Sequence, residues 1–133
     1  LNETIKKNIL FLDNFEFNKD HYNKLIKSMG IKENIFKNNK DFSKKVGFLG
    51  SKVSGGQKQI TALARVFNKK NDIVFLDEPT NNLDIKIKRK VINFLKNYQG
   101  TLIVVTHDKE ILKVCNKIYE FKDGKTFLKK NYN

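Results

Sequence analysis

The stretch Ile73 to Asp84, IVFLDEPTNNLD, decides the fold. Four consecutive apolar residues run into Asp77 and Glu78, and Pro79 prevents further strand pairing through its own nitrogen. The pattern predicts a strand that is buried on both faces, as in parallel sheets covered by helices, where ligands bind beyond the carboxyl ends of the strands. Asp77 and Glu78 therefore stand where chemistry is usually placed. The same residues can equally form a polar turn after a core strand.

Helices and strands alternate in the expected order of elements, which favours an α/β fold with a parallel sheet and helical crossovers. The expected elements are a helix at 20–29 ended by Gly30, a largely irregular segment with a short helix at 34–45, a helix at 56–68, a strand at 72–77, a helix from Ile87 to Tyr98 closed by Gly100, a strand at 101–106, a short helix through Cys115, and a hairpin of 117–121 and 125–128. We expect a mainly helical part at 1–50 and an α/β part at 51–133.

Composition limits the class of protein. The 133 residues suffice for one domain or part of one, and the first residues look like a cut end without a signal peptide. The net charge of +13 comes from scattered Lys residues interleaved with Asn, which favours compositional bias over a dedicated nucleic-acid surface. The single Cys115 lies in an apolar stretch and is expected to be a core thiol in a reducing compartment. His21 begins a helix on its polar side and is expected to be solvated.

Ser54-Gly55-Gly56-Gln57 opens the helix at 56–68. Ser54 and Gln57 have the spacing of a capping box, which satisfies the first amides of a helix. The two glycines also leave those amides uncovered at the positive end of the helix dipole, where a phosphate group could approach the backbone. The segment is therefore either an ordinary helix start or an anion site.

His107 follows the second predicted strand as Asp77 follows the first. A histidine at a strand end is often structural, but two neighbouring parallel strands would bring His107 near Glu78. Asp77 could supply an oxygen ligand to Mg²⁺. Glu78 could then polarise an attacking water, while His107 could position that water or a γ-phosphate.

These segments together resemble the nucleotide-binding domain of ATP-binding cassette (ABC) proteins. The matching stretches are VSGGQKQ at 53–59, IVFLDEPT at 73–80, NNLD at 81–84 and VVTHD at 104–108, which are similar in turn to the signature motif, the Walker B strand, the D-loop and the H-loop. The resemblance covers essentially the whole chain. It implies the C-terminal part of a P-loop NTPase fold, in which a helical subdomain precedes a parallel-sheet core with flanking helices.

The resemblance also implies roles for single residues. Asp77 would bind Mg²⁺ through water, Glu78 would be the catalytic base and His107 would contact the γ-phosphate of ATP. Residues of the signature and the D-loop would bind a nucleotide held by a second nucleotide-binding domain; these are Ser54, Gly55, Gly56, Gln57 and Asp84. The alternative for Asp84 is an N-cap of the helix that follows it.

Several elements of the family are missing from the 133 residues. They contain no Walker A loop, G-x-x-x-x-G-K-[ST], which supplies most of the phosphate contacts. The adenine-stacking aromatic residue and the Q-loop that precede the helical subdomain in the family are missing as well. The chain is thus expected to be the C-terminal half of such a domain and to be inactive as an ATPase alone.

Three functions remain open at this stage. The first is an exporter-like ABC transporter ATPase at the cytoplasmic face of a membrane, working with ATP, Mg²⁺, a second nucleotide-binding domain and transmembrane domains. The second is a soluble ABC protein that acts on ribosomes or nucleic acid, although Gln57 and the helical region before the signature favour the transporter. The third is a catalytically inactive fragment.

Overall fold

The computed structural model describes residues 2–11, 18–34 and 43–131. The helical elements are α1 (Ile5–Leu10), α2 (Lys19–Ser28), α3 (Ile31–Asn34), the 3-10 turn η1 (Phe48–Gly50), α5 (Gly55–Phe67), α6 (Ile85–Lys96) and α7 (Lys109–Val114). The strands are β1 (Ile73–Asp77), β2 (Thr101–Val105), β3 (Lys117–Lys122) and β4 (Lys125–Asn131). Most of the irregular segment expected at 34–45 lies outside the described residues.

The two apolar strands pair in parallel, as the alternation of elements predicts. β1 and β2 are joined through the crossover helix α6, and their register places Ile73 opposite Thr101 and Asp77 opposite Val105. The hairpin of β3 and β4 is also confirmed, but among the described residues it forms a separate antiparallel sheet. Its turn residues Asp123 and Gly124 both have positive φ, at 50° and 70°, as a two-residue hairpin turn requires.

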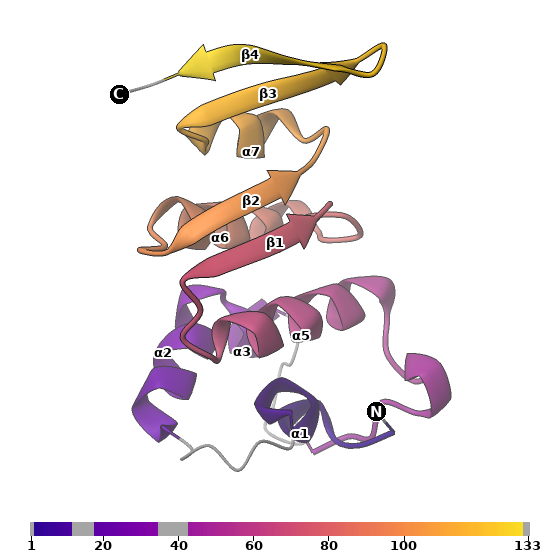
Figure 1. Ribbon diagram of the computed structural model, residues 1–133. Helices are drawn as coiled ribbons and strands as arrows, with labels where there is room; N and C mark the ends of the chain where they lie inside the picture. The colour runs from indigo at the N-terminus through magenta and orange to yellow at the C-terminus, as the bar shows by residue number, and fades with distance from the viewer. Residues whose placement is uncertain (1, 12–17, 35–42, 132–133) are drawn as a thin grey trace.

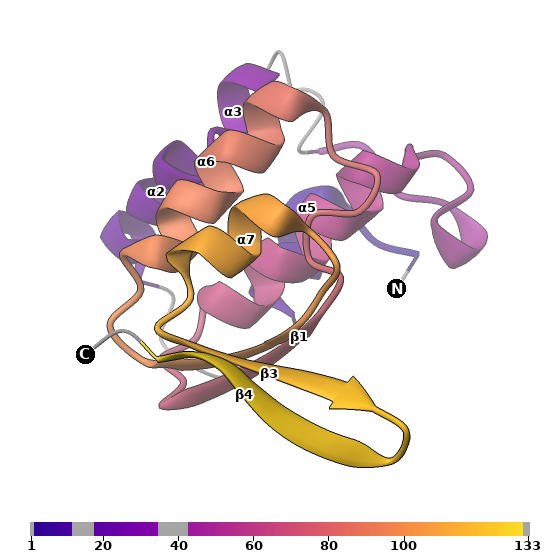
Figure 2. The same ribbon diagram turned by 90° about the horizontal axis from the view of Figure 1, so that it is seen from above.

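Helices cover only one face of the parallel pair. Figure 2 shows α5, α6 and α7 on one side of β1 and β2, with no described helix on the other. The strand burial alternates accordingly, since Val74 and Leu76 are buried whereas Phe75 is 73% exposed. On β2, Ile103 and Val105 are likewise exposed. The expectation of a strand buried on both faces is therefore wrong for the described chain, because the apolar run contains two faces and only one is covered.

One hydrophobic core connects the N-terminal helices to the α/β part (Figure 1). It is formed by fully or nearly buried aliphatic and aromatic side chains from α1, α2, α5, β1 and α6, including Ile5, Ile9, Tyr22, Leu25, Ile60, Leu63, Phe67, Val74, Leu76, Val91 and Leu95. Helix α5 is central to this core, since its apolar stripe contacts both α1 and α2. The division into parts at 1–50 and 51–133 stays a prediction.

The helix ends agree with the predictions at two places and differ at a third. Helix α5 lies one residue earlier than expected at each end, and Gly30 follows α2 with a φ of 63°, as a terminating glycine should. Helix α6 ends at Lys96, so Tyr98 lies beyond it. The Tyr98 hydroxyl instead donates a hydrogen bond to the Asn71 carbonyl at 2.6 Å. Gly100 therefore does not close the helix.

Two side chains have environments other than those expected. His21 is not simply solvated, because its Nε2 lies 3.1 Å from the Phe67 carbonyl oxygen and so links α2 to the end of α5. Cys115 is half-buried rather than a full core residue, and its thiol donates to the Ile111 carbonyl at 3.3 Å.

Candidate functional site

Glu78 and His107 meet at the carboxyl ends of the parallel strands, as the strand order predicts. The Glu78 amide donates to the Val105 carbonyl at 2.9 Å and so extends the β1–β2 ladder by one residue. Glu78 then turns the chain with a φ of 42°, in the left-handed region that non-glycine residues rarely adopt. The result is a carboxylate that faces the residues that follow β2. Strained backbone of this kind is concentrated at functional sites.

Both oxygens of the Glu78 carboxylate are held. Its Oε1 accepts from the His107 backbone amide at 3.1 Å and lies 2.7 Å from His107 Nδ1, which donates when protonated. Its Oε2 accepts from the Thr106 hydroxyl at 3.2 Å. The imidazole is 81% exposed, so its other nitrogen, Nε2, is open to a ligand. The pair thus has a fixed carboxylate and an accessible imidazole.

The surroundings of Glu78 favour its ionised form. Desolvation alone raises the pKa of this carboxyl, but the His107 hydrogen bonds, the charge of His107 and the Thr106 hydroxyl outweigh it and hold the pKa below its usual value. At neutral pH the group is therefore a carboxylate, which can accept a proton from water or orient it.

Asp77 occupies a different position from its neighbour. It ends β1 on the uncovered face of the sheet, which it shares with Phe75, and it is exposed. Among the described residues its side chain has no hydrogen bond or ion pair, and no group of three or more His, Cys, Asp or Glu side chains is placed to hold a metal ion. A single free carboxylate fits Mg²⁺, which retains most of its water and takes few oxygen ligands from protein.

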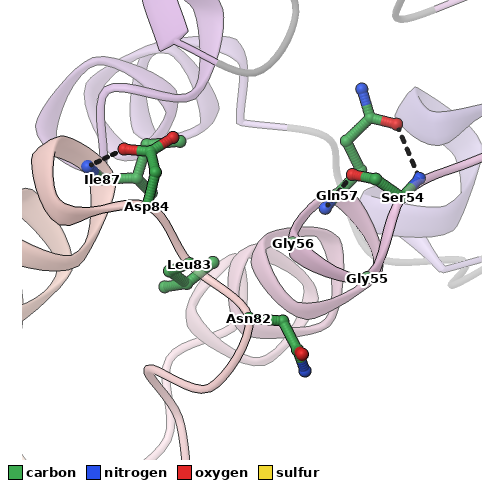
Figure 3. A pocket seen from close by; sticks show the side chains of 8 residues that line it. All are labelled: Ser54, Gly55, Gly56, Gln57, Asn82, Leu83, Asp84 and Ile87. Atoms are coloured by element: carbon green, nitrogen blue, oxygen red, sulfur yellow. Dashed lines mark hydrogen bonds between the residues drawn. The ribbon is translucent and has the colours of Figure 1, made fainter.

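The other predicted site residues line a pocket between the start of α5 and the segment before α6 (Figure 3). The pocket is formed by Ser54, Gly55, Gly56, Gln57, Asn82, Leu83, Asp84 and Ile87. The capping box is confirmed, because the Gln57 backbone amide donates to Ser54 Oγ at 3.2 Å and the Ser54 backbone amide donates to Gln57 Oε1 at 3.1 Å. Asp84 is the N-cap of α6, which was the alternative predicted for it, because its side chain accepts from the Ile87 backbone amide at 3.0 Å.

The structure shows why position 56 of this pocket must be a glycine, which the sequence does not reveal. A Cβ atom on Gly56 would lie 2.7 Å from the backbone oxygen of Asn82, whereas a Cβ on Gly55 would approach the Asn82 side chain no closer than 3.4 Å. Asn82 itself has a φ of 62°. Gly56 is therefore required by the close approach of the 82–84 backbone, whatever it contributes to anion binding.

Within the described chain the predicted site residues other than Asp77 form two groups. Glu78 and His107 form one, and the residues of the pocket form the other. A hydrogen bond connects them, because Gln59 on α5 donates from Nε2 to the Glu78 carbonyl at 3.3 Å. Gln59, Thr106 and Asn82 were not predicted as site residues. The signal for Thr106 was present, since a hydroxyl residue directly before His107 at a strand end can reach the same carboxylate.

A parallel strand pair with a helical crossover, acidic strand ends and a glycine-opened helix is the arrangement of nucleotide-binding α/β folds. Residues 2–81, more than half of the chain, match the sequence profile of the ABC transporter family, and the chain belongs to this family.

Similar proteins agree with this assignment. The chain is 44% identical over 73 residues to the putative ABC transporter ATP-binding protein sll0385 of Synechocystis, an alignment that covers 54% of this chain and 26% of that protein. It is 38% identical over 85 residues to the uncharacterised ABC transporter ATP-binding protein YbbA of Escherichia coli, with 61% and 37% covered. The chain thus spans about a quarter to a third of the curated relatives' length.

A solved structure shows the same fold. The structure of a bacterial Atm1-family ABC exporter with ATP bound superposes with a TM-score of 0.79 and 25% identity, covering 93% of this chain and 22% of that chain. The chain is accordingly an α/β fragment of an ABC nucleotide-binding domain. Among its described residues, none of the helices has the length and apolar character needed to cross a membrane.

Proposed function

We propose that this chain is the C-terminal half of an exporter-like ABC nucleotide-binding domain whose ATP hydrolysis energises transport across a membrane. The observation that carries the proposal is the 2.7 Å contact between Glu78 Oε1 and His107 Nδ1 at the ends of two parallel strands. It joins a base to a group able to contact a phosphate. The similarity to an ABC exporter with ATP bound supports ATP as the nucleotide and an exporter-like domain.

The residues then take the following roles. Glu78 accepts the proton of the attacking water, and the exposed Nε2 side of His107 contacts the γ-phosphate of ATP. Asp77 would hold Mg²⁺ through water, and the metal would supply charge neutralisation at the phosphates. The Walker A contacts come from outside these 133 residues, so the chain alone neither binds ATP tightly nor hydrolyses it.

The second group of residues serves a second nucleotide-binding domain. Ser54, Gly55, Gly56 and Gln57 present the start of α5, where backbone amides favour phosphate, and Asp84 lies beside them in the same pocket. This arrangement supports a dimer in which each copy completes the nucleotide site of the other. The similarity to an ABC exporter favours a place for this dimer at the cytoplasmic face of a membrane, joined to transmembrane domains.

The test is a matched pair of isosteric substitutions in a complete nucleotide-binding domain that contains this chain. Glu78→Gln removes the base but keeps the shape, and it should abolish steady-state ATP hydrolysis while ATP binding persists. Glu120→Gln on β3 makes the same chemical change at an exposed ion pair with Lys129 and should leave turnover intact. Unchanged turnover in the Glu78 variant would refute the proposed base.

A further inference from the structure

Asp108 joins three segments that are distant in sequence. Its Oδ2 accepts from the Thr80 hydroxyl at 2.7 Å and lies 2.9 Å from Lys88 Nζ, while its Oδ1 accepts from the Glu110 amide at 3.0 Å. Thr80 follows β1, Lys88 belongs to α6 and Glu110 lies in the first turn of α7. One carboxylate thus fixes the relative positions of the residues after both strands.

Asp108 is linked to the Glu78 carboxylate through the Thr106 hydroxyl. The Asp108 amide donates to Thr106 Oγ1 at 3.0 Å, and that hydroxyl donates in turn to Glu78 Oε2 at 3.2 Å. The intervening His107 holds the other oxygen. A continuous path therefore runs from the Lys88 ammonium through Asp108 and Thr106 to Glu78.

Lys88 also connects this path to the pocket. Its backbone amide donates to the Asp84 carbonyl at 2.8 Å, so it lies one helical turn after the D-loop residue. Any displacement of the 82–84 segment that carries α6 with it would move the ammonium that Asp108 contacts.

Asp108 is largely buried, so its negative charge needs the positive charge of Lys88 to compensate it. The Asp108 side chain is only 11% exposed and the Lys88 side chain 26% exposed, so the ion pair is largely withdrawn from water. Lys88 has a second, longer contact with Glu110 at 3.8 Å. Removing one partner of such a pair leaves an uncompensated charge, and the remaining carboxylate must move or find another partner.

We propose that Lys88 is a positioning residue for the Glu78–His107 pair, acting through Asp108 and Thr106, and that it couples the pocket at 82–84 to the reacting carboxylate. The inference rests on the proposed function as an ATPase. Lys88 contacts neither Glu78 nor His107 in the structure and holds the turn from which both oxygens of Glu78 receive their hydrogen bonds.

The experiment compares Lys88→Met, Lys88→Arg and Lys86→Met in a complete nucleotide-binding domain that contains this chain. Lys86 is an exposed residue on the same helix and serves as the matched control. We expect Lys88→Met to lower kcat for ATP by about tenfold with KM nearly unchanged, since the geometry of the base and not ATP binding is altered. Lys88→Arg should recover most of this loss, and Lys86→Met should behave as the unaltered protein.

Two further measurements separate positioning from folding. Hydrogen exchange of the His107 amide should be faster in Lys88→Met than in the other two variants, because the turn is released. Asp108→Asn removes the buried charge, so adding Lys88→Met to it should cause little further loss of kcat, whereas additive losses would show that Lys88 acts elsewhere.

The outcomes distinguish this inference from the proposed function. If Glu78→Gln abolishes turnover but Lys88→Met keeps normal kcat and normal exchange at His107, the role of Lys88 is refuted and the base stands. If turnover does not depend on Glu78, the proposed function fails, and the claim that Lys88 positions a catalytic pair fails with it.

Discussion

Replacing Gly56 by Ala tests whether the pocket is closed by a backbone contact. The new Cβ would lie 2.7 Å from the Asn82 carbonyl oxygen, whereas even close carbon–oxygen contacts are about 3.3–3.6 Å. A backbone oxygen cannot rotate away as a side chain does, so either the 82–84 segment or the start of α5 must shift. Overpacking of this kind costs about 1–3 kcal/mol.

The neighbouring glycine provides the control. A Cβ on Gly55 would meet only Asn82 side-chain atoms, at 3.4 Å or more, which is ordinary contact. Both substitutions gain helix propensity of up to about 1 kcal/mol, less in a first turn, so this gain largely cancels between them. The difference between Gly56→Ala and Gly55→Ala therefore isolates the contact with Asn82, and we expect Gly56→Ala to be less stable by about 1–3 kcal/mol.

Urea unfolding followed by circular dichroism measures this difference. With a slope of about 1–3 kcal/mol/M, the midpoint of Gly56→Ala should lie roughly 1 M below that of Gly55→Ala. The slopes should agree, because neither change alters the surface exposed on unfolding. Equal midpoints, or a higher one for Gly56→Ala, would show that the 82–84 backbone yields without cost and would refute the reasoning.

Three further predictions concern the chain itself. Purified as these 133 residues it should show no tight binding of Mg-ATP by calorimetry and no phosphate release, since the Walker A loop is missing; magnesium-dependent turnover would contradict this. Leu76→Ala should lower the free energy of unfolding by about 2–5 kcal/mol because Leu76 is 7% exposed in the core, whereas Phe75→Thr should change it by less than about 1 kcal/mol and reduce dye binding to the uncovered sheet face. Desolvation raises the pKa of Asp108, but Lys88 and Thr80 outweigh it and lower that pKa below its usual 3.8. Ionised Asp108 therefore contributes to the free energy of unfolding at neutral pH, and this contribution is lost as the pH falls through the lowered pKa. Denaturation midpoints measured between about pH 5 and pH 2 should thus fall more steeply for the unaltered chain than for Asp108→Asn. Parallel curves would contradict the assignment.

Local sequence patterns were sufficient for most elements and for the first group of site residues. The apolar run before Asp77 and the run before Thr106 predicted two strands, and a helix between them favours a parallel pairing. This pairing alone brings His107 to Glu78, because parallel strands end at the same edge. The capping box of Ser54 and Gln57 and the turn at Gly124 are equally local, so they too were predictable.

Other features needed the packed chain. The apolar run at 73–76 does not state how many faces of the strand are covered, and only the positions of the helices decide that Phe75 is exposed while Leu76 is buried. The carbonyl of Phe67 that His21 contacts is 46 positions away in the sequence. No pattern within either segment encodes that contact.

What the sequence by itself determined was the kind of each element and the chemistry at its ends, since strand alternation, helix spacing and capping depend on residues within a few positions of one another. Only the tertiary structure decided why Gly56 must be a glycine and which cation compensates Asp108, because both depend on atoms brought together from separate segments. Distances between such atoms are set by how α5, α6 and the two strands pack, and packing is a property of the whole chain.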